Sequence, residues 1–452
     1  MTTTRTTALR AGMSRRALLA ASGGVLAGLS GLAAGCGSRA FVQATGAVPA
    51  RYARRTHIVF WHSFASIVGD AMQKLVDEFN DIQDEIYVDA QFQGSYDQTA
   101  QKLAAGVIAR QVPDISIFSE ITWRKFHLAD ALEPLNDYFD ADLAPTAYLD
   151  QFISEGTVKG TIWWMPFARS TPLFYYNKEI FAKAGLPDRG PRTWTELREW
   201  GPAIQGVRTA SGPAKVHALT SGDADWFFQA KVWQWGGNYS KGLEVTIDTE
   251  RPIAAGEWMI DFIRKVKMAY LSASSNIDFA NGVAATTEMS TGGLRNATEQ
   301  AKFPVGAAFL PAFEHFGCPT GGSGFGIMAT STPARKRAAF EFVKFVATPQ
   351  KSAQWSIATG YLPIIKAAQQ EPALLAATKE NPNFAVAVRQ LERTRVQDLA
   401  RLVVPNANVT MYTALQRLYS SRDSVPDVFA TLARKLRSSA DLMREKYDRH
   451  YT

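Results

Sequence analysis

The hydrophobic pattern over residues 56–118 alternates between strand-like and helix-like stretches. It predicts strands at 57–61, 86–92 and 115–118, a helix around 72–79 and another over 97–109. The first helix shows apolar residues at a helical spacing, Met72, Leu75, Val76 and Phe79. This alternation is typical of an α/β protein with a mostly parallel sheet covered by helices.

The ends of these strands predict where a ligand would lie. Ligands of α/β sheets bind beyond the carboxyl ends of the strands. Ser63, the turn at 94–96 and Glu120 each follow one of the three strands. We therefore expect them on one rim of the sheet.

A second block continues the α/β pattern beyond residue 160. Its patterns predict strands at 161–167 and 170–178 and helices at 194–205, 256–269, 334–347 and much of 383–449. The stretch 321–326 is rich in glycine but matches neither a phosphate-binding loop nor a nucleophile elbow. It is interpreted either as a turn where backbone approaches a ligand or as a plain loop. A chain of 452 residues is also too long for one core, which predicts at least two domains.

The positive charge of the chain is confined to its beginning. The net charge is +7, which by itself would suggest a nucleic-acid partner. Residues 1–57 hold eight arginines and no acidic residue, and setting those eight aside leaves the remainder at −1. No nucleic-acid partner is expected.

Residues 1–35 have the order of an export signal. A basic stretch ends in Ser14-Arg15-Arg16-Ala17-Leu18-Leu19, and a Gly-rich apolar run leads to small residues before Cys36. The paired arginines resemble a twin-arginine signal, and Cys36 resembles the lipidated cysteine of a bacterial lipobox. Ala33 stands where such boxes usually carry leucine, so ordinary cleavage without lipid is the alternative. Residues 36–55 are interpreted as a tether between the lipid and the body.

Catalytic and metal-binding patterns are weak in the remainder. The six histidines are scattered, and Cys318 is the only cysteine besides Cys36, so no metal site, cofactor or thiol chemistry is predicted. Five tryptophans are each candidates either for a core or for stacking on a ligand: Trp163, Trp164, Trp226, Trp233 and Trp235.

Several strings of the body resemble the solute-binding proteins of ABC importers, and more narrowly the glycerol-3-phosphate and glycerophosphodiester-binding branch. The resemblance runs through Phe60-Trp61-His62-Ser63, Gly94-Ser95-Tyr96, Ser170-Thr171-Pro172, Tyr175-Tyr176-Asn177-Lys178, Ala184-Gly185-Leu186-Pro187, Thr193-Trp194 and Thr359-Gly360-Tyr361-Leu362-Pro363-Ile364. It implies an α/β fold of two lobes with a ligand cleft between them and a hinge of several strands. The lobe boundaries expected from it are 56–166 and 285–330 for the first lobe, and 167–284 and 331–452 for the second.

The resemblance also implies the ligand-binding positions. They are Tyr96, Glu120, Ser170, Trp226, Ser290, Gly322 and Tyr361. A carboxylate such as Glu120 accepts hydrogen bonds from vicinal hydroxyls, while serines and a backbone amide donate to phosphate oxygens. A tryptophan ring supports a glycerol or a quaternary ammonium group.

One position departs from the branch. The place where relatives carry an arginine for phosphate aligns with Val409, and Arg169 and Arg401 are candidate substitutes. A neutral sugar or polyol such as trehalose or maltose is therefore an alternative ligand. An exported hydrolase acting on glycerophosphodiesters is a competing class. The resemblance implies a monomeric, non-enzymatic receptor that works with the permease subunits of an importer.

Overall fold

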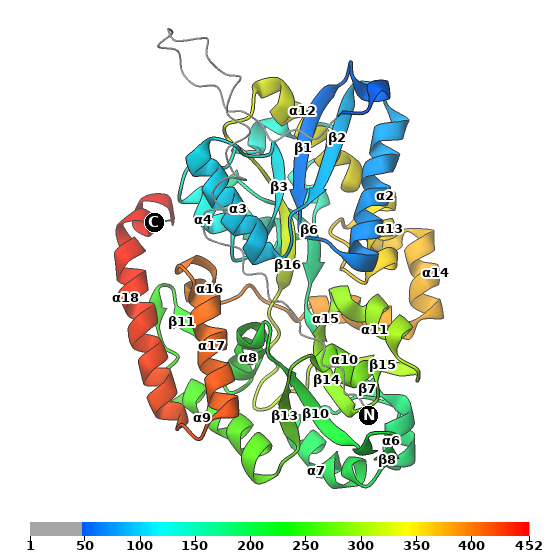
Figure 1. The fold of residues 1–452 in the computed structure, drawn as a ribbon, viewed down its shortest axis with the longest axis vertical. Helices are drawn as coiled ribbons and strands as arrows, with labels where there is room; N and C mark the ends of the chain where they lie inside the picture. Colours follow the sequence, from blue (N-terminus) through cyan, green and yellow to red (C-terminus); the bar gives the residue numbers. More distant parts are fainter. Residues whose placement is uncertain (1–47, 452) are drawn as a thin grey trace, which may run out of the picture. The chain divides into compact units, whose positions relative to one another are not determined.

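The computed structural model describes residues 48–451, which contain two five-stranded sheets (Figure 1). The first sheet has the order β2-β1-β3-β16-β6, and its strands are β1 (Thr56–His62), β2 (Ile86–Phe92), β3 (Ile115–Ser119), β6 (Met165–Ser170) and β16 (Gly321–Ile327). β1 pairs in parallel with β2 and β3, whereas β16 is antiparallel to both of its neighbours. The predicted α/β fold class is confirmed.

Helices cover the first sheet because each buries an apolar stripe against it. These helices include α2 (Ser66–Ile82), α3 (Tyr96–Ala109), α4 (Trp123–His127), α5 (Asp150–Glu155), α12 (Pro333–Val346) and α13 (Pro349–Thr359). In α2 the predicted stripe of Met72, Leu75, Val76 and Phe79 is buried. Of the predicted elements, the strands at 57–61, 86–92 and 115–118 and both helices are confirmed.

The second sheet has the order β13-β10-β14-β7-β15. Its strands are β7 (Pro172–Asn177), β10 (Lys215–Thr220), β13 (Ala269–Ser272), β14 (Ala284–Ser290) and β15 (Val305–Ala308). Its helices include α6 (Lys178–Lys183), α7 (Trp194–Gln205), α8 (Ala224–Gln234), α9 (Glu250–Ile260), α10 (Ser275–Ala280), α11 (Leu294–Gln300), α17 (Ala407–Ser420) and α18 (Val425–Tyr451). The helix predicted at 256–269 begins and ends earlier: α9 starts at Glu250, continues as a π-helical turn over Asp261–Lys265, and β13 begins at Ala269.

The chain passes between the two sheets through adjacent segments. β6 ends at Ser170 and β7 begins at Pro172, so one passage takes a single residue. The segment 309–320 leads from β15 to β16, and 392–398 leads from α15 (Pro382–Leu391) to α16 (Leu399–Val403). These two segments hydrogen-bond to each other, since Thr320 N donates to Arg395 O at 3.0 Å and Arg395 N donates to Cys318 O at 3.1 Å. Together with the passage from β6 to β7 they form the connection between the two sheets.

The expected lobe boundaries are wrong in the second half of the chain. Residues 285–308 were expected in the first lobe, but β14 and β15 pair with β7 in the second sheet. Residues 331–360 were expected in the second lobe, but α12 contacts β1 and α13 contacts α2. Strand pairing decides this membership, and the hydrophobic pattern carries no information on which distant strand is the partner.

The body also begins earlier than expected. Part of the proposed tether, 50–55, packs against the first sheet: Tyr52 is 5% exposed and stacks on Tyr87 at 4.4 Å. Arg55 forms an ion pair with Asp84 at 2.8 Å and lies over the Tyr52 ring. Arg55, one of the basic residues assigned to the tether, therefore packs against the start of β1. The signal, Cys36 and the first part of the tether fall outside the described residues.

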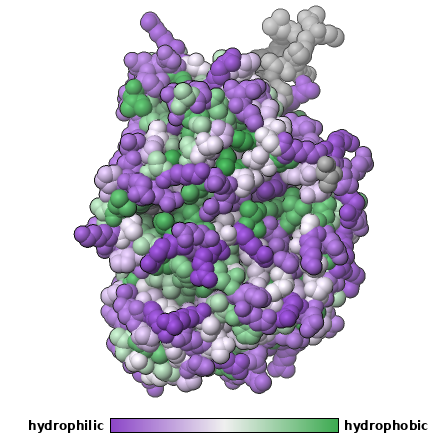
Figure 2. All heavy atoms as spheres, turned by 180° about the vertical axis from the view of Figure 1, so that it is seen from behind, coloured by the Kyte–Doolittle hydropathy of each residue, from purple (hydrophilic) through white to green (hydrophobic). Residues whose placement is uncertain are grey.

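The face of the molecule seen in Figure 2 carries mostly hydrophilic side chains, with apolar side chains interspersed. Within residues 48–451 no helix combines the length and apolar character needed to cross a bilayer.

Candidate functional site

A cavity of about 290 Å³ lies where the two sheets meet, and it brings together all seven positions implied by the resemblance. The lining residues from that set are Tyr96, Glu120, Ser170, Trp226, Ser290, Gly322 and Tyr361. They come from segments that span 266 positions of the chain, from 96 to 361. Ser63 is not among the lining residues, because its hydroxyl is hydrogen-bonded to Thr99 at 2.7 Å.

The first sheet positions Tyr96 and Glu120 through the ends of its strands. Ser95 and Gln98 form a capping box at the start of α3, which fixes Tyr96 as the first residue of that helix. Tyr96 Oη donates to Ser323 Oγ at 2.9 Å. Glu120 follows β3 directly, and its backbone N donates to Gly322 O at 3.1 Å. Both side chains therefore face the cavity from rigid elements.

Tyr361 enters the cavity through a helix end. α13 ends at Gly360 with φ of +95°, a left-handed conformation that suits glycine. The Tyr361 ring then packs against Gly292, where an added Cβ would lie 2.6 Å from the ring. Burial raises the pKa of both Tyr96 and Tyr361, so the two phenols remain hydrogen-bond donors near neutral pH.

The second sheet contributes Ser290 and Trp226. Ser290 ends β14, and Trp226 lies in the first turn of α8. Trp226 Nε1 donates to Thr320 O at 3.0 Å, and its ring lies so close to Gly321 that a Cβ there would be 2.5 Å away. The indole is thus fixed as a wall of the cavity.

The glycine-rich stretch 321–326 is a central strand rather than the turn or loop considered from the sequence. β16 lies between β3 and β6, and the register shifts between Gly322 and Gly324. Gly322 has φ of +102°, and a Cβ there would lie 2.0 Å from Ala168 O. Only glycine fits this close backbone approach, which brings the main chain to the cavity surface.

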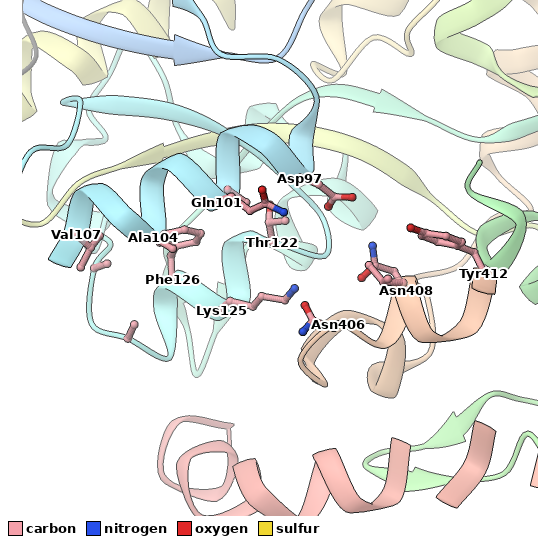
Figure 3. A pocket seen from close by; sticks show the side chains of 14 residues that line it. Asp97, Gln101, Ala104, Val107, Thr122, Lys125, Phe126, Asn406, Asn408 and Tyr412 are labelled. Carbon is pink, nitrogen blue, oxygen red and sulfur yellow. The ribbon is translucent and has the colours of Figure 1, made fainter. Parts of the chain in front are cut away.

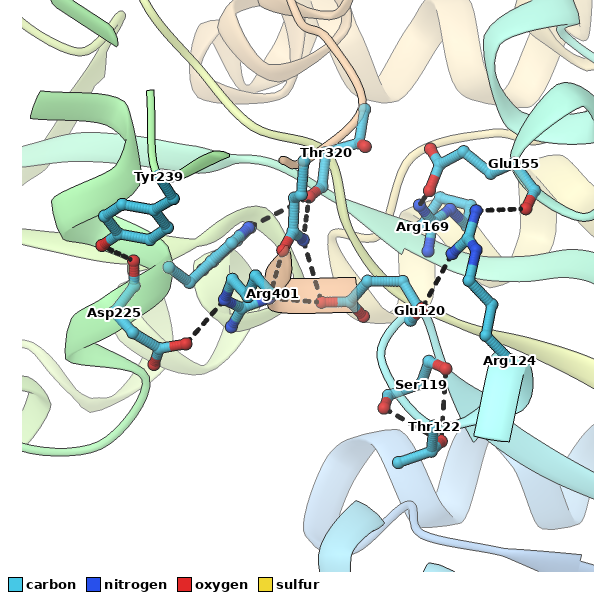
Figure 4. A network of polar contacts seen from close by, with 12 residues as sticks. Ser119, Glu120, Thr122, Arg124, Glu155, Arg169, Asp225, Tyr239, Thr320 and Arg401 are labelled. Carbon is cyan, nitrogen blue, oxygen red and sulfur yellow. Dashed lines mark hydrogen bonds and ion pairs between the residues drawn. The ribbon is translucent and has the colours of Figure 1, made fainter. Parts of the chain in front are cut away.

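Arg401 is the cation of this cavity. Its Nε donates to Asp225 Oδ2 at 2.6 Å, and its Nη1 contacts Gln397 and lies 3.4 Å from Glu120 Oε1 (Figure 4). Gln397 Nε2 also donates to Glu120 Oε1 at 3.0 Å. These contacts within the described residues use Nε and Nη1, which leaves Nη2 for a ligand oxygen. Of the two substitutes considered for the missing arginine, this one lines the site.

Arg169, the other candidate substitute for the missing arginine, does not line the cavity. It is 0% exposed and forms an ion pair with Glu155 at 2.6 Å, with its guanidinium between the rings of Phe152 and Trp164. Successive side chains of a strand point to opposite faces. Because Ser170 faces the cavity, Arg169 points into the core of the first lobe, and its proposed role as a ligand contact is wrong.

Val409 lies in a separate groove beside the cavity. The groove measures about 550 Å³ and runs between α3 and α4 on one side and the start of α17 on the other (Figure 3). It shares Asp97 and Asn408 with the cavity, and Lys125 lies across it. Val409 is not among the residues lining the cavity, whereas Arg401 is.

Four of the five candidate tryptophans lie outside the cavity lining. Trp164 is fully buried, Trp235 stacks on Phe313 at 4.0 Å, and Trp163 contacts His127. Trp233 Nε1 donates to Asp398. Of these five tryptophans, only Trp226 lines the cavity.

Two carboxylates of the cavity, Asp97 and Asp223, were missed from the sequence. Solvent in the cleft reaches Asp223, but the surrounding protein reduces the hydration of its carboxylate. That desolvation, together with the nearby charge of Asp225, raises the pKa of Asp223 to about 6. Burial likewise raises the pKa of Asp225, although Arg401 opposes this effect. No local motif marks Asp223, because its position depends on how α8 packs against α9 and α17 in the second lobe.

The charges around the cavity have an acidic excess. Asp97, Glu120, Asp223 and Asp225 stand against Arg401, with Lys125 near Asp97 in the adjoining groove. Such a site suits a ligand that carries hydroxyls and a positive group in addition to one anionic group. Within residues 48–451, no cluster of three histidine, cysteine or carboxylate side chains has a metal-binding arrangement.

Comparisons with known proteins agree with this geometry. Residues 74–386 match the family model described as bacterial extracellular solute-binding protein. The chain is 29% identical over 365 residues to the sn-glycerol-3-phosphate-binding periplasmic protein UgpB of Pectobacterium atrosepticum, covering 74% of this chain and 79% of that protein. It is 28% identical over 364 residues to UgpB of Escherichia coli, covering 74% of this chain and 80% of that protein.

Solved structures show the same relationship. The structure resembles UgpB from Mycobacterium tuberculosis in complex with glycerophosphocholine, with a TM-score of 0.81, 34% identity and coverage of 85% of this chain and 98% of that one. It shares the fold of the cyclic α-maltosyl-1,6-maltose binding protein from Arthrobacter globiformis, with a TM-score of 0.73, 21% identity and coverage of 86% of this chain and 100% of that one. The predicted two-lobed fold is confirmed, and the chain belongs to the bacterial extracellular solute-binding protein family.

Proposed function

We propose that this protein captures a glycerophosphodiester or glycerol 3-phosphate outside the cytoplasm and delivers it to the permease subunits of an ABC importer. The observation that carries the proposal is the arrangement of one guanidinium, several carboxylates and several neutral donors around a single cavity between the two lobes. Relatives named for glycerol 3-phosphate and for glycerophosphocholine support the same ligand class. Closure of the lobes on the ligand is the conformational change that a permease would detect.

Each part of such a ligand has a matching group. Glu120 Oε2 accepts no hydrogen bond from the described residues, so the carboxylate can accept from glycerol hydroxyls. The free Nη2 of Arg401 meets a phosphate oxygen, and the hydroxyls of Ser170 and Ser290 and the backbone of Gly322 lie around it. Trp226 provides a flat apolar wall for the remainder of the ligand.

The acidic excess favours a diester with an ammonium head group over glycerol 3-phosphate. Glycerol 3-phosphate is close to a dianion at neutral pH, and the single Arg401 already neutralises buried Asp225. A zwitterionic diester brings one negative charge to Arg401 and one positive charge to the carboxylates. Its net charge of zero is the better complement to this cavity.

Calorimetric titration with glycerophosphocholine, glycerophosphoethanolamine, glycerol 3-phosphate, trehalose and maltose tests the proposal. We expect saturable 1:1 binding of a diester, weaker binding of glycerol 3-phosphate and no heat with either disaccharide. Binding of the disaccharides alone would replace the proposal with the neutral-sugar alternative, for which the apolar face of Trp226 is the supporting feature.

The proposed cycle of capture, closure and release involves no covalent chemistry. A hydrolase of glycerophosphodiesters would cleave the ligand during prolonged incubation with added divalent metal. We expect the diester to be recovered intact, and release of glycerol 3-phosphate in proportion to protein would make the protein an enzyme.

A monomer in solution is expected for the same receptor cycle.

We further propose that the protein is exported by a twin-arginine signal in 1–35 and anchored by lipid on Cys36. Replacing Cys36 with alanine is expected to move the protein from the membrane fraction to the soluble extracytoplasmic fraction. Metabolic labelling with a radioactive fatty acid checks the modification directly. Label that persists on the Cys36→Ala variant would contradict the assignment of the anchor.

A further inference from the structure

Asp223 is an acidic side chain of the cavity that the fold leaves without a partner. It precedes α8 with φ of +53°, and its carboxylate does not cap that helix. Among the described residues, none donates a hydrogen bond to it. Asp223 shares the cavity with Trp226, which lies in the first turn of the same helix.

The guanidinium that lines the cavity with Asp223 is already paired with other acids. Arg401 is held by Asp225 at 2.6 Å and lies 3.4 Å from Glu120. Lys125 lines the adjoining groove, where it interacts electrostatically with Asp97. Among the described residues that line the cavity, Asp97 and Asp223 are the carboxylates without a direct ion pair, and Asp223 is the one that immediately precedes the helix carrying Trp226. A ligand can provide the ion pair that Asp223 lacks.

We propose that Asp223 is the specificity-determining residue for the ligand's head group and selects an ammonium that carries N–H donors, as in glycerophosphoethanolamine, over a quaternary ammonium. This inference rests on the proposed function. A primary ammonium donates charge-assisted hydrogen bonds to a carboxylate, which are about twice as strong as bonds between neutral groups. A quaternary ammonium has no N–H, so it gains only charge attraction and contact with the face of an aromatic ring.

Trp226 serves both head groups, which isolates the effect of Asp223. A cation over an indole is stabilised whether or not it carries N–H groups. The difference between the two ligands therefore depends on the carboxylate. One charge-assisted hydrogen bond corresponds to a preference of about tenfold or more for the primary ammonium.

Calorimetry with glycerophosphoethanolamine and glycerophosphocholine tests this inference on the protein and on two variants. Asp223→Asn keeps the shape and tolerates the left-handed backbone. Asp130→Asn is the matched control, because Asp130 also has a left-handed backbone but is not among the residues lining the cavity. We expect the unmodified protein and Asp130→Asn to prefer glycerophosphoethanolamine by about tenfold. We expect Asp223→Asn to bind the two ligands within about threefold of each other.

Two results separate this inference from the proposed function. Equal or tighter binding of glycerophosphocholine by the unmodified protein overturns the role of Asp223 and leaves the proposed function intact. If Asp223→Asn still prefers glycerophosphoethanolamine over glycerophosphocholine, the role of Asp223 is likewise overturned and the proposed function is unaffected. If neither diester binds, the proposed function itself fails.

The pH dependence of binding gives a second readout. The groups that face Asp223 are Asp97, Glu120, Asp225 and Arg401, and the pKa of Asp223 is raised to about 6. Protonation below that pH removes the negative charge that the ammonium needs, so affinity is expected to be full above pH 6 and to fall as the pH decreases through 6. The phosphodiester and the primary ammonium of the ligand keep their charges over this range.

Titrations with glycerophosphoethanolamine at pH 5, 6 and 7.5 measure this dependence. The unmodified protein is expected to lose most of its preference for the primary ammonium at pH 5. The Asp223→Asn variant is expected to show a much flatter profile. Identical profiles for the two proteins would contradict a charged role for Asp223.

Discussion

Replacing Glu120 with alanine is expected to lower the affinity for a glycerophosphodiester by about 100-fold or more. Glu120 is 6% exposed and lies opposite Arg401, so its carboxylate accepts from glycerol hydroxyls in a largely dehydrated cavity. Each hydrogen bond to a charged group contributes about 1.5–3 kcal/mol, and two are lost together. Calorimetric titration measures the change.

The folded state of this variant is expected to survive, because Arg401 keeps its bond to Asp225. Glu133→Ala is a matched control, since Glu133 also forms an ion pair, with Lys336, but is not among the residues lining the cavity. The control should bind like the unmodified protein. Unchanged affinity in Glu120→Ala, with an intact thermal transition, would remove Glu120 from the ligand contacts.

Replacing Arg169 with methionine is expected to destabilise the protein by about 3–5 kcal/mol. The substitution leaves the Glu155 carboxylate, 2% exposed, without its ion-pair partner in the core. Chemical denaturation measures the free energy of unfolding. The double variant Arg169→Met with Glu155→Gln removes both charges and is expected to recover most of the loss.

Arg169 also provides a contrast with Arg401. Arg169 points away from the cavity, so the surviving folded fraction of Arg169→Met should bind the ligand within about threefold of the unmodified protein. A variant that keeps its stability but loses binding would show that Arg169 contacts the ligand after all, as the sequence first suggested.

Much of the fold and of the candidate site could be predicted from local sequence patterns. The buried strand Thr56–His62 and the apolar stripe of α2 were predicted from periodicity, since each element buries a face that the sequence displays. The seven cavity positions were identified through motif resemblance. They lie at strand ends and helix starts, where local sequence and position in the fold are tightly linked.

The features that were not predicted depend on contacts between residues far apart in the chain, which the sequence does not display. Glycines at 321–326 suggested a loop, yet they form a central strand because neighbouring backbones approach too closely for a Cβ. Arg401 and Glu120 are 281 positions apart and meet only in the folded chain. Asp223 has no motif at all, and it reaches the cavity only through the position of α8 in the fold.

A crystal structure with a glycerophosphodiester bound would show each ligand contact. We expect the ligand in the cavity between the two sheets, with glycerol hydroxyls on Glu120, a phosphate oxygen on Arg401 and the head group beside Asp223 and Trp226. A ligand bound outside this cavity, or one whose phosphate lies away from Arg401, would contradict the account.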